Sequence, residues 1–301
     1  MALNETVARK GTLYVVATPV GNLDDITLRA LAVLKSCDTI AAEDTRVTRR
    51  LLDRYGITAR LLSLHEHNEQ SAAAGVVGRL KAGEAVSYVS DAGTPGVADP
   101  GARLVSTVRA AGFPVVPLPG ANAVSVALSV CGWEASRYRF CGFLPARATE
   151  RHKALLPLRG DPDLLVFYET PHRVLEAVAD MCAVLGAERR ILIARELTKL
   201  HESLHVCTLG EAEGWLAGDP NRQRGEFVLV VEGAAPVVDG AAVDVTSVLT
   251  PLLEALPLKQ AVALTVRLTG AARNAVYAQA LELRGKLRDN ADTPESGATP
   301  E

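Results

Sequence analysis

The 301-residue sequence lacks the long apolar segments of a membrane protein. No apolar run approaches the roughly 20 residues that a helix needs to cross a bilayer. The stretch Met1–Lys10 is polar and lacks the apolar core of a secretory signal peptide. The five cysteines are odd in number, widely spaced and form no C-x-x-C pair, which suits reduced thiols better than a disulfide framework. We therefore expect a cytoplasmic protein.

Aromatic residues and an excess of basic charge are also scarce. Aromatic residues make up 4% of the chain and the formal net charge is −3, so any contact with nucleic acid must come from local basic patches. Few rings are available to stack on bases, which disfavours a long single strand as the partner of any nucleic-acid contact. The hydrophobic content of 48% with 22% charged residues is typical of a globular protein.

The first 130 residues alternate strand-like and helix-like segments. Short buried strands are predicted at Leu13–Thr18, Thr39–Ala42, Leu61–Leu64, Ala85–Ser90 and Val115–Leu118. Helical spacing lies between them, as at Ile26–Lys35 and Ala102–Ala111, with Gly83 and Gly112 at the expected helix ends. Such alternation favours an α/β fold in which helices cover both faces of a parallel sheet.

A second α/β segment and a small helical segment follow. Further strands are predicted at Leu164–Tyr168, Ile191–Ala194 and Phe227–Glu232, and a helix from Thr170 and Pro171 to about Leu185. Three short helices are predicted at Val248–Leu253, Leu258–Leu268 and Arg273–Leu283. The predicted organisation is an α/β domain over 11–131, a second over 132–234, a linker over 235–247, a helical domain over 248–288 and a disordered tail over 289–301.

Three loops rich in glycine and proline follow the first, fourth and fifth predicted strands. They are Pro19–Asp24, Ser90–Gly101 and Pro119–Ala123. Ligands of open parallel sheets bind beyond the carboxyl ends of the strands, and glycine lets the backbone approach them closely. Neither G-x-G-x-x-G nor G-x-x-x-x-G-K-[ST] is present, which disfavours a dinucleotide site or a P-loop. Three such loops together favour a small-molecule site over ordinary tight turns, without identifying the ligand.

Several motifs in these loops resemble one known family. The motifs are T-P-V-G-N-L-D-D, A-E-D-T-R-V-T, S-L-H-E-H-N-E, S-D-A-G-T-P-G-V-A-D-P-G, P-G-A-N-A, G-F-L-P, Y-E-T-P-H-R and R-E-L-T-K. In order and spacing they resemble the ribosomal RNA small subunit methyltransferase I family, the cytidine 2′-O-methyltransferase branch of the tetrapyrrole methylase superfamily. The resemblance covers about Gly11 to Gly233, and residues from Leu258 to Tyr277 resemble the small C-terminal helical domain of that family.

The resemblance implies a fold, a cofactor and a substrate. Two α/β domains would hold S-adenosylmethionine in the cleft between them, usually in a homodimer. The substrate would be a cytidine of 16S rRNA, within the small ribosomal subunit. The implied cofactor-binding residues are Pro19, Gly21, Asp91, Ala92, Gly93, Thr94, Pro95, Ala121, Asn122, Ala123, Tyr168 and Phe227.

Candidate catalytic residues follow the second predicted strand. Asp44 is placed to orient or deprotonate the ribose hydroxyl, and Arg46 to hold a phosphate or stabilise developing negative charge. The alternative is that Asp44 caps the next helix and Arg46 lies on its solvated face. Lys199 is a second candidate base, but only if burial or nearby cations lower its pKa.

Basic side chains that suit phosphate contacts occur in three regions of the sequence. The candidate RNA-binding residues in these regions are Arg49, Arg50, Arg147, Lys259 and Arg273; Arg173, in the Y-E-T-P-H-R motif, is a further candidate at the RNA entrance. Each region also fits an ordinary solvated helix face, so the RNA-binding interpretation rests on their sum.

No metal is expected, although two histidine motifs invite one. His201–His205 matches H-E-x-x-H, yet that zinc signature needs a helix and here Leu204, Val206 and Thr208 alternate like a strand. His65–His67 fits a surface turn better than a metal site. Two other functions stay open: a methyltransferase for a small tetrapyrrole, and a non-enzymatic nucleic-acid-binding protein.

Overall fold

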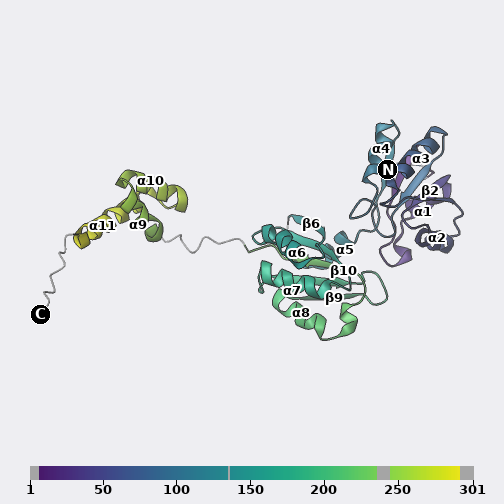
Figure 1. Ribbon diagram of the computed structural model, residues 1–301. Coiled ribbons are helices and arrows are strands. Elements are labelled where there is room, and N and C mark those ends of the chain that lie inside the picture. The colour runs from purple at the N-terminus through teal and green to yellow at the C-terminus, as the bar shows by residue number, and fades with distance from the viewer. Residues whose placement is uncertain (1–6, 135, 236–244, 292–301) are drawn as a thin grey trace. The chain divides into compact units, whose positions relative to one another are not determined.

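The computed structural model describes residues 7–134, 136–235 and 245–291 of the chain (Figure 1). The described residues up to Ala234 form one compact unit, and those from Ala235 onward form a second. No described helix is both long enough and apolar enough to span a bilayer.

The first sheet is parallel and has helices on both faces. Its five strands, in the order β3-β2-β4-β1-β5, are β1 (Leu13–Val16), β2 (Thr39–Ala42), β3 (Arg60–Ser63), β4 (Val86–Val89) and β5 (Val115–Leu118). The connecting helices are η1 (Leu23–Asp25), α1 (Leu28–Ser36), α2 (Thr45–Arg54), α3 (Glu69–Lys81) and α4 (Ala102–Ala110). Helices α1 and α2 pack on one face, and α3 and α4 on the other. The expected doubly covered parallel sheet is confirmed.

The second sheet is mixed. Its strands, in the order β6-β7-β10-β8-β9, are β6 (Tyr138–Phe143), β7 (Leu164–Glu169), β8 (Arg190–Arg195), β9 (Ser203–Thr208) and β10 (Phe227–Val231). Only β6 and β7 pair in parallel; the other pairs are antiparallel. The helices of this part are α5 (Ala123–Val130), α6 (Ala148–Leu155), η2 (Leu156–Leu158), α7 (Val174–Leu185), α8 (Leu209–Ala217) and η3 (Pro220–Gln223).

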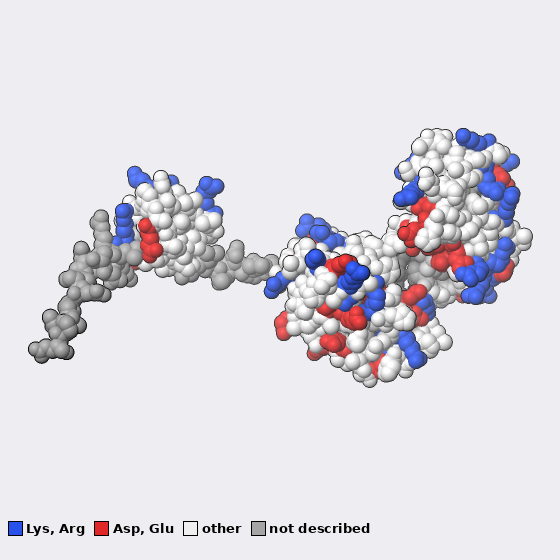
Figure 2. All heavy atoms as spheres, in the orientation of Figure 1, with Lys and Arg blue, Asp and Glu red and all other residues white. Residues whose placement is uncertain are grey.

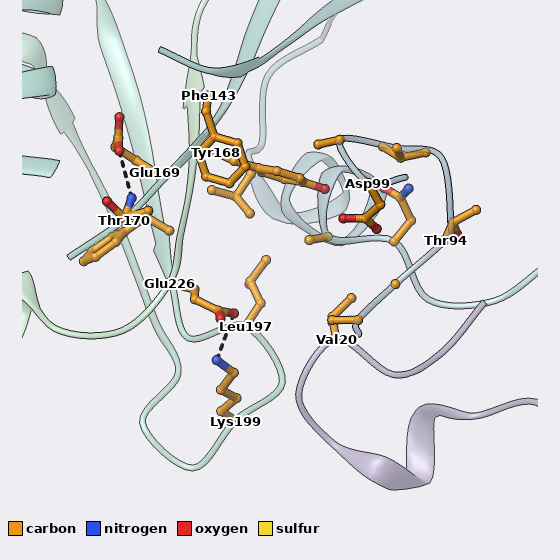
Figure 3. Close-up of a pocket in the computed structure, with 18 residues that line it drawn as sticks. Val20, Thr94, Asp99, Phe143, Tyr168, Glu169, Thr170, Leu197, Lys199 and Glu226 are labelled. Atoms are coloured by element: carbon orange, nitrogen blue, oxygen red, sulfur yellow. Dashed lines mark hydrogen bonds and ion pairs between the residues drawn. The ribbon is translucent and has the colours of Figure 1, made fainter. Parts of the chain in front are cut away.

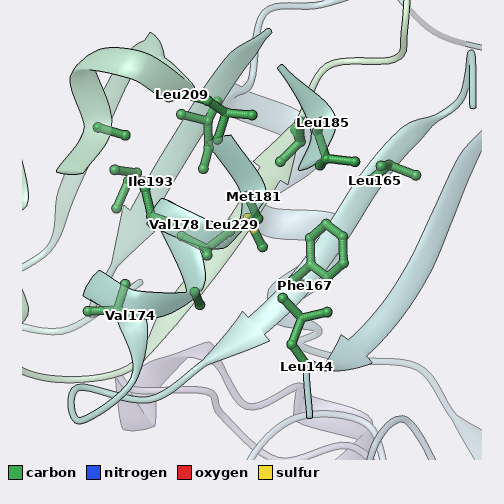
Figure 4. Close-up of a cluster of buried hydrophobic side chains, with 14 of the residues drawn as sticks. Leu144, Leu165, Phe167, Val174, Val178, Met181, Leu185, Ile193, Leu209 and Leu229 are labelled. Carbon is green, nitrogen blue, oxygen red and sulfur yellow. The ribbon is translucent and has the colours of Figure 1, made fainter. Parts of the chain in front are cut away.

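Alternation along the strands divides the second sheet into two cores. Side chains at successive positions of a strand point to opposite faces. On β7, Leu165 and Phe167 therefore pack against α6, α7 and α8 (Figure 4). Leu164 and Val166 pack on the other face, against Val124 and Ala127 of α5.

Helix α5 crosses from one sheet to the other. It follows β5 of the first sheet, yet its buried face packs on the second. The second core thus begins at Val124, before the boundary that the sequence indicated at 131/132. This crossing brings the loop after β5 between the two sheets.

Helix α7 begins later than the sequence analysis predicted. Helix α7 starts at Val174 and not at Thr170 or Pro171, because the backbone of Arg173 (φ −128°, ψ −13°) departs from helical geometry. The predicted helix ends at Gly83 and Gly112 are confirmed, since both glycines adopt positive φ directly after the caps of α3 and α4.

The C-terminal unit contains three described helices around a small core. They are α9 (Val245–Ala255), α10 (Leu258–Thr269) and α11 (Arg273–Ala291), which pack through Leu249, Ala261, Val262, Val276 and Ala280. Gly270, in the left-handed region (φ 68°), ends α10 and turns the chain into α11. Residues 245–247 and 289–291, expected in the linker and the tail, are helical, and Ala235 is in no helix or strand; residues 236–244 and 292–301 lie outside the described residues.

A buried carboxylate ties the long loop after β4 to the first sheet. Helix α4 has glycine, Gly101, as its N-cap and no side-chain cap of its own. Instead, one oxygen of the buried Glu69 on α3 accepts hydrogen bonds from the backbone N–H groups of Gly101 (3.0 Å), Arg103 (3.0 Å) and Leu104 (3.2 Å).

We expect Glu69→Ala to lower the free energy of unfolding by about 2–4 kcal/mol, because it leaves buried donors without their charged acceptor. Chemical denaturation checks this, with the exposed Glu66→Ala as control, expected to stay within about 0.5 kcal/mol of the parent. Equal stabilities of the two variants would contradict the capping role.

Candidate functional site

Three loops meet at the carboxyl edge of the first sheet. The backbones of Thr18 and Gly93 exchange two hydrogen bonds, at 2.8 Å and 3.0 Å, which join the loops after β1 and β4. The hydroxyl of Thr94 donates to the carbonyl of Ala121 at 3.0 Å and joins the loop after β5. The three glycine- and proline-rich loops predicted to form one site therefore lie together.

Glycine is required at two points of this junction. Gly93 has φ +75°, and a Cβ there would lie 3.4 Å from Val20. A Cβ on Gly120 would lie 2.8 Å from the Cβ of Ala17, closer than real Cβ contacts allow. Gly93 is therefore favoured by its backbone conformation, and Gly120 by the close approach of Ala17.

A cavity of about 260 Å³ lies beside these loops (Figure 3). From the first part of the chain it is lined by Val20, Ala92, Gly93, Thr94, Val97, Ala98, Asp99, Asn122 and Ala123. From the second it is lined by Phe143, Tyr168, Glu169, Thr170, Leu197, Lys199, Glu226, Phe227 and Val228. Figure 3 shows Phe143 and Tyr168 on one side of it, and Asp99, Thr94 and Val20 on the other. Most of the lining is apolar, with a few polar groups, as is typical of a small-molecule site.

Three carboxylates line the cavity, and two of them are neutralised. Glu169 is ion-paired with Arg173 at 2.8 Å, and Glu226 with Lys199 at 3.0 Å. No described cation is paired with Asp99. The charged groups near it are the carboxylates of Glu43 and Asp91, which repel its negative charge. Asp99 is thus the acceptor that a cationic or hydroxyl-bearing ligand would meet.

The surroundings of Asp99 disfavour its negative charge. Burial raises the pKa of Asp99 to about 6, with a further increase from Glu43 that the hydrogen bond from Ser90 only partly offsets. Burial also raises the pKa of Glu43 and of Asp91. Burial, followed by the charge of Asp99, raises the pKa of the neighbouring Tyr168 to about 12.

Lys199 lies in a loop that contacts the first part of the chain. A Cβ on Gly21 would lie 2.5 Å from the side chain of Lys199, and the N–H of Asn22 donates to the hydroxyl of Thr198 at 3.0 Å. Burial lowers the pKa of Lys199, but hydrogen bonds to Glu196 and Glu226 outweigh burial and raise it above its usual value. The condition for Lys199 to act as a base, a lowered pKa, is therefore not met.

Asp44 and Arg46 do not line the cavity. Asp44 is the N-cap of α2, as the structural alternative held, and accepts a hydrogen bond from the N–H of Arg46 at 2.8 Å. The exposed guanidinium of Arg46 binds the same carboxylate at 2.6 Å. These hydrogen bonds lower the pKa of Asp44 to about 2, so it is a weak proton acceptor. The N–H of Asp44 donates to Asp91 at 2.9 Å, which connects this pair to the loop after β4.

The expected cofactor residues fall into two groups. Those that line the cavity are Ala92, Gly93, Thr94, Asn122, Ala123, Tyr168 and Phe227. Those that lie in the same loops but do not line it are Pro19, Gly21, Asp91, Pro95 and Ala121. Sequence reasoning missed Asp99 and Phe143, although both stand inside the quoted motifs S-D-A-G-T-P-G-V-A-D-P-G and G-F-L-P.

Most of the candidate RNA-binding residues are solvent-exposed. Arg49, Arg50, Arg147, Lys259 and Arg273 have exposed side chains. Arg173 differs, because its guanidinium is ion-paired with the buried Glu169 and donates to the carbonyl of Leu144. Among the charged side chains on the visible face of the C-terminal unit, Lys and Arg predominate (Figure 2).

The H-E-x-x-H sequence lacks the helical geometry that a zinc protease requires. Residues Ser203–Thr208 form strand β9, and the ring of His205 stacks on Trp215 with centroids 4.0 Å apart. Within the described parts of the chain, no three His, Cys, Asp or Glu side chains gather as a metal site.

Comparison with known proteins places this fold in a class. The model of the family described as Tetrapyrrole (Corrin/Porphyrin) Methylases matches residues 12–213. Among solved structures, cobalt precorrin-4 methyltransferase aligns with a TM-score of 0.57 at 15% identity, over 74% of this chain and 95% of that one. Uroporphyrin-III C-methyltransferase from Thermus thermophilus, complexed with S-adenyl homocysteine, aligns with a TM-score of 0.53 at 17% identity, over 73% and 97%. The chain therefore belongs to the tetrapyrrole methylase family, whose fold it shares.

Relatives that align over nearly the whole chain identify the particular family within this class. "Ribosomal RNA small subunit methyltransferase I" of Escherichia coli O157:H7 is 48% identical over 92% of this chain and 96% of its own length. The protein of the same name from Neisseria meningitidis serogroup B is 49% identical over 92% and 95%. The model described as RsmI C-terminal HTH domain matches residues 239–284. The chain belongs to the ribosomal RNA small subunit methyltransferase I family, which confirms the resemblance found in its motifs.

The raised pKa of Asp99 predicts a pH-dependent difference in stability between the parent and Asp99→Asn. The folded protein keeps the Asp99 proton up to about pH 6 and the unfolded chain only to about pH 4, so the contribution of Asp99 to stability falls as pH rises through this window. Asp99→Asn should therefore gain stability relative to the parent between pH 4 and 6 and keep that gain above pH 6. Urea denaturation from pH 4 to 8 measures it. A difference that does not change with pH would contradict the assignment.

Proposed function

We propose that this protein transfers a methyl group from S-adenosylmethionine to the 2′-hydroxyl of a cytidine in small-subunit ribosomal RNA. The observation that carries the proposal is the cavity at the junction of the three loops, in a chain whose nearly full-length relatives bear the name of this rRNA methyltransferase. A substrate inside the small ribosomal subunit, a cytoplasmic location and a homodimer complete the proposal.

The lining of the cavity fits S-adenosylmethionine. This molecule needs an apolar slot for adenine, acceptors for its hydroxyl and ammonium groups, and donors for its carboxylate. Side chains such as Val20, Leu197 and Phe227 supply the apolar surface. Asp99, which no described cation pairs with, supplies an acceptor. Further polar groups come from the main chain at Ala92, Thr94 and Ala123, whereas the main-chain groups of Gly93 are already paired with Thr18.

The residues of this chain position and enclose the reactants. When bound, S-adenosylmethionine supplies an electrophilic methyl carbon, which the ribose oxygen must approach in line with the bond to sulfur. The ion pair between Lys199 and Glu226 holds the loop on one side of the cavity. Asp44 has too low a pKa, and Lys199 too high a pKa, to take up a proton at neutral pH. We infer that the hydroxyl proton passes to water, while Asp44 orients Arg46 toward the RNA backbone.

A tetrapyrrole substrate is the less favoured alternative. The solved structures named for precorrin or uroporphyrin share 15–20% identity with this chain, whereas the rRNA methyltransferases share 44–49%. The basic surface of the C-terminal helices has a use in RNA binding and none in binding a small tetrapyrrole.

The direct test uses small ribosomal subunits from Escherichia coli cells that lack their own methyltransferase I. Incubation with this protein and labelled S-adenosylmethionine should place the label in 2′-O-methylcytidine after digestion to nucleosides. Asp99→Asn is the matched low-activity control. Label in a base-methylated nucleoside, or none in the RNA, would refute the proposal.

We expect Asp99→Asn to weaken S-adenosylmethionine binding at least about tenfold, since it removes a charged hydrogen-bond acceptor from the cavity. Asp91→Asn is the matched comparison: its carboxylate accepts from the N–H of Asp44 and does not line the cavity. Calorimetry that finds the larger loss for Asp91→Asn would transfer the acceptor role to Asp91, the residue that the sequence motif indicated.

Removal of residues 235–301 should leave S-adenosylmethionine affinity nearly unchanged and weaken methylation of ribosomal subunits. The reason is that the cavity lies wholly within the first compact unit, whereas Lys259, Arg267, Arg273 and Arg284 expose their charges on the second. Calorimetry and methylation rates on the truncated protein check both parts. A full rate with the truncated protein would assign the C-terminal helices another role.

A further inference from the structure

Exposed aromatic side chains are rare in the described part of this chain. Among the described Phe, Tyr and Trp residues, only Tyr138, Phe143 and Tyr277 are exposed, at 54%, 50% and 41% of their surface. Of these three, only Phe143 lines the cavity. Neither the predicted cofactor contacts nor the proposed RNA contacts make use of it.

An irregularity in β6 directs Phe143 toward the cavity. Phe140 pairs with Val166 of β7, but the next pair is Gly142 with Phe167, so Cys141 is an extra residue in the strand. Phe140 and Phe143 are three positions apart and would face opposite sides of a regular strand. The bulge at Cys141 puts both on one face, where each packs edge-on against Tyr168, at 4.9 Å and 5.7 Å between ring centroids. Bulges commonly redirect a side chain beside a functional site.

A glycine allows the backbone conformation of this bulge. Gly142 has φ +65°, in the left-handed region that favours glycine, and a Cβ there would meet no atom within 4 Å. The position therefore selects glycine for its backbone conformation and not for lack of space. The G-F pair of the G-F-L-P motif thus has a geometric reason: the glycine forms the bulge that aims the phenylalanine.

Two arginines hold the backbone that follows Phe143. Arg173 donates to the carbonyl of Leu144 while its guanidinium is ion-paired with Glu169. Arg151, whose side chain is 2% exposed, donates to the carbonyls of Pro145 (3.3 Å) and Ala146 (3.1 Å) and is ion-paired with Asp180. These buried charges fix the loop, so the half-exposed ring of Phe143 is held in place at little cost in conformational entropy on binding.

We propose that Phe143 is the platform on which the base of the target nucleotide stacks while its ribose hydroxyl enters the cavity. A rigid ring with an exposed face, beside a cavity for the methyl donor, suits a flat heteroaromatic group that must be held next to that donor (Figure 3). Tyr168 supports the ring edge-on from behind. This inference rests on the proposed function, because it names the part of the RNA that the cavity mouth binds.

The test compares Phe143→Ala, Phe143→Trp and Tyr138→Ala in methylation of the same ribosomal subunits. Loss of one base stack should raise KM for the subunits roughly 10- to 100-fold in Phe143→Ala. Phe143→Trp, which keeps a stacking face, should stay within about threefold of the parent. Tyr138→Ala removes a similarly exposed ring from the far end of the same strand and should leave KM unchanged.

Two further measurements on Phe143→Ala separate stacking from other roles. Calorimetry should give the parent affinity for S-adenosylmethionine, because the ring stacks on the base and not on the cofactor. Thermal denaturation should show a melting temperature lowered by only a few degrees, because half of the surface of Phe143 is exposed and the rest packs on Tyr168. An unchanged KM, or a loss of cofactor affinity as large as the loss in KM, would overturn the proposal. If the parent protein itself methylates no subunits, the proposed function fails, and the equal inactivity of every variant distinguishes that outcome from a failure of the stacking role alone.

Discussion

The pair of backbone hydrogen bonds between Thr18 and Gly93 is the constraint on which the candidate site depends. It joins the loops after β1 and β4 at the edge of the sheet, and the bond from Thr94 to Ala121 extends the junction to the loop after β5. Because these contacts use main-chain groups and small side chains, they leave room for a ligand beside them. They also fix where α5 begins, and α5 is the element that packs the second sheet against this edge.

The second sheet and its loops complete the cavity, and the charged side chains that they contribute to its lining are ion-paired with one another or with Arg173. Arg173 and Glu169 hold the backbone after β6. Lys199, in the loop that contacts Gly21, is ion-paired with Glu196 of the same loop and with Glu226, the residue before β10. Charged pairs of this kind contribute little net stability when partly exposed, but they fix geometry. Neutralising these groups leaves Asp99 as the lining carboxylate without a described cationic partner, and Phe143 as the exposed lining ring.

Much of the fold followed from the sequence because the strands of the first sheet are short, apolar and separated by glycine and proline. Strand β2, for example, has the bounds predicted for it, Thr39–Ala42. Strand β6 was not predicted, since Tyr, Arg and Gly within it obscure the alternation and the bulge breaks the period. The three loops that form the site were predicted from their glycine and proline content. Asp99 was missed, because its raised pKa arises from burial and from Glu43, which is distant in sequence. The packing of α5 on the second sheet could not be predicted either, because the spacing of apolar residues shows that a helix has a buried face but not which surface covers it.

Hydrogen–deuterium exchange with and without S-adenosylmethionine tests the central claim, that loops from both sheets form one cofactor site. The account predicts slower exchange on binding in the peptides that cover 18–24, 90–101, 119–124, 167–170, 197–199 and 226–228, and no change in α2 or in residues 245–284. Protection confined to the loops of the first sheet, or centred on α2, would contradict it.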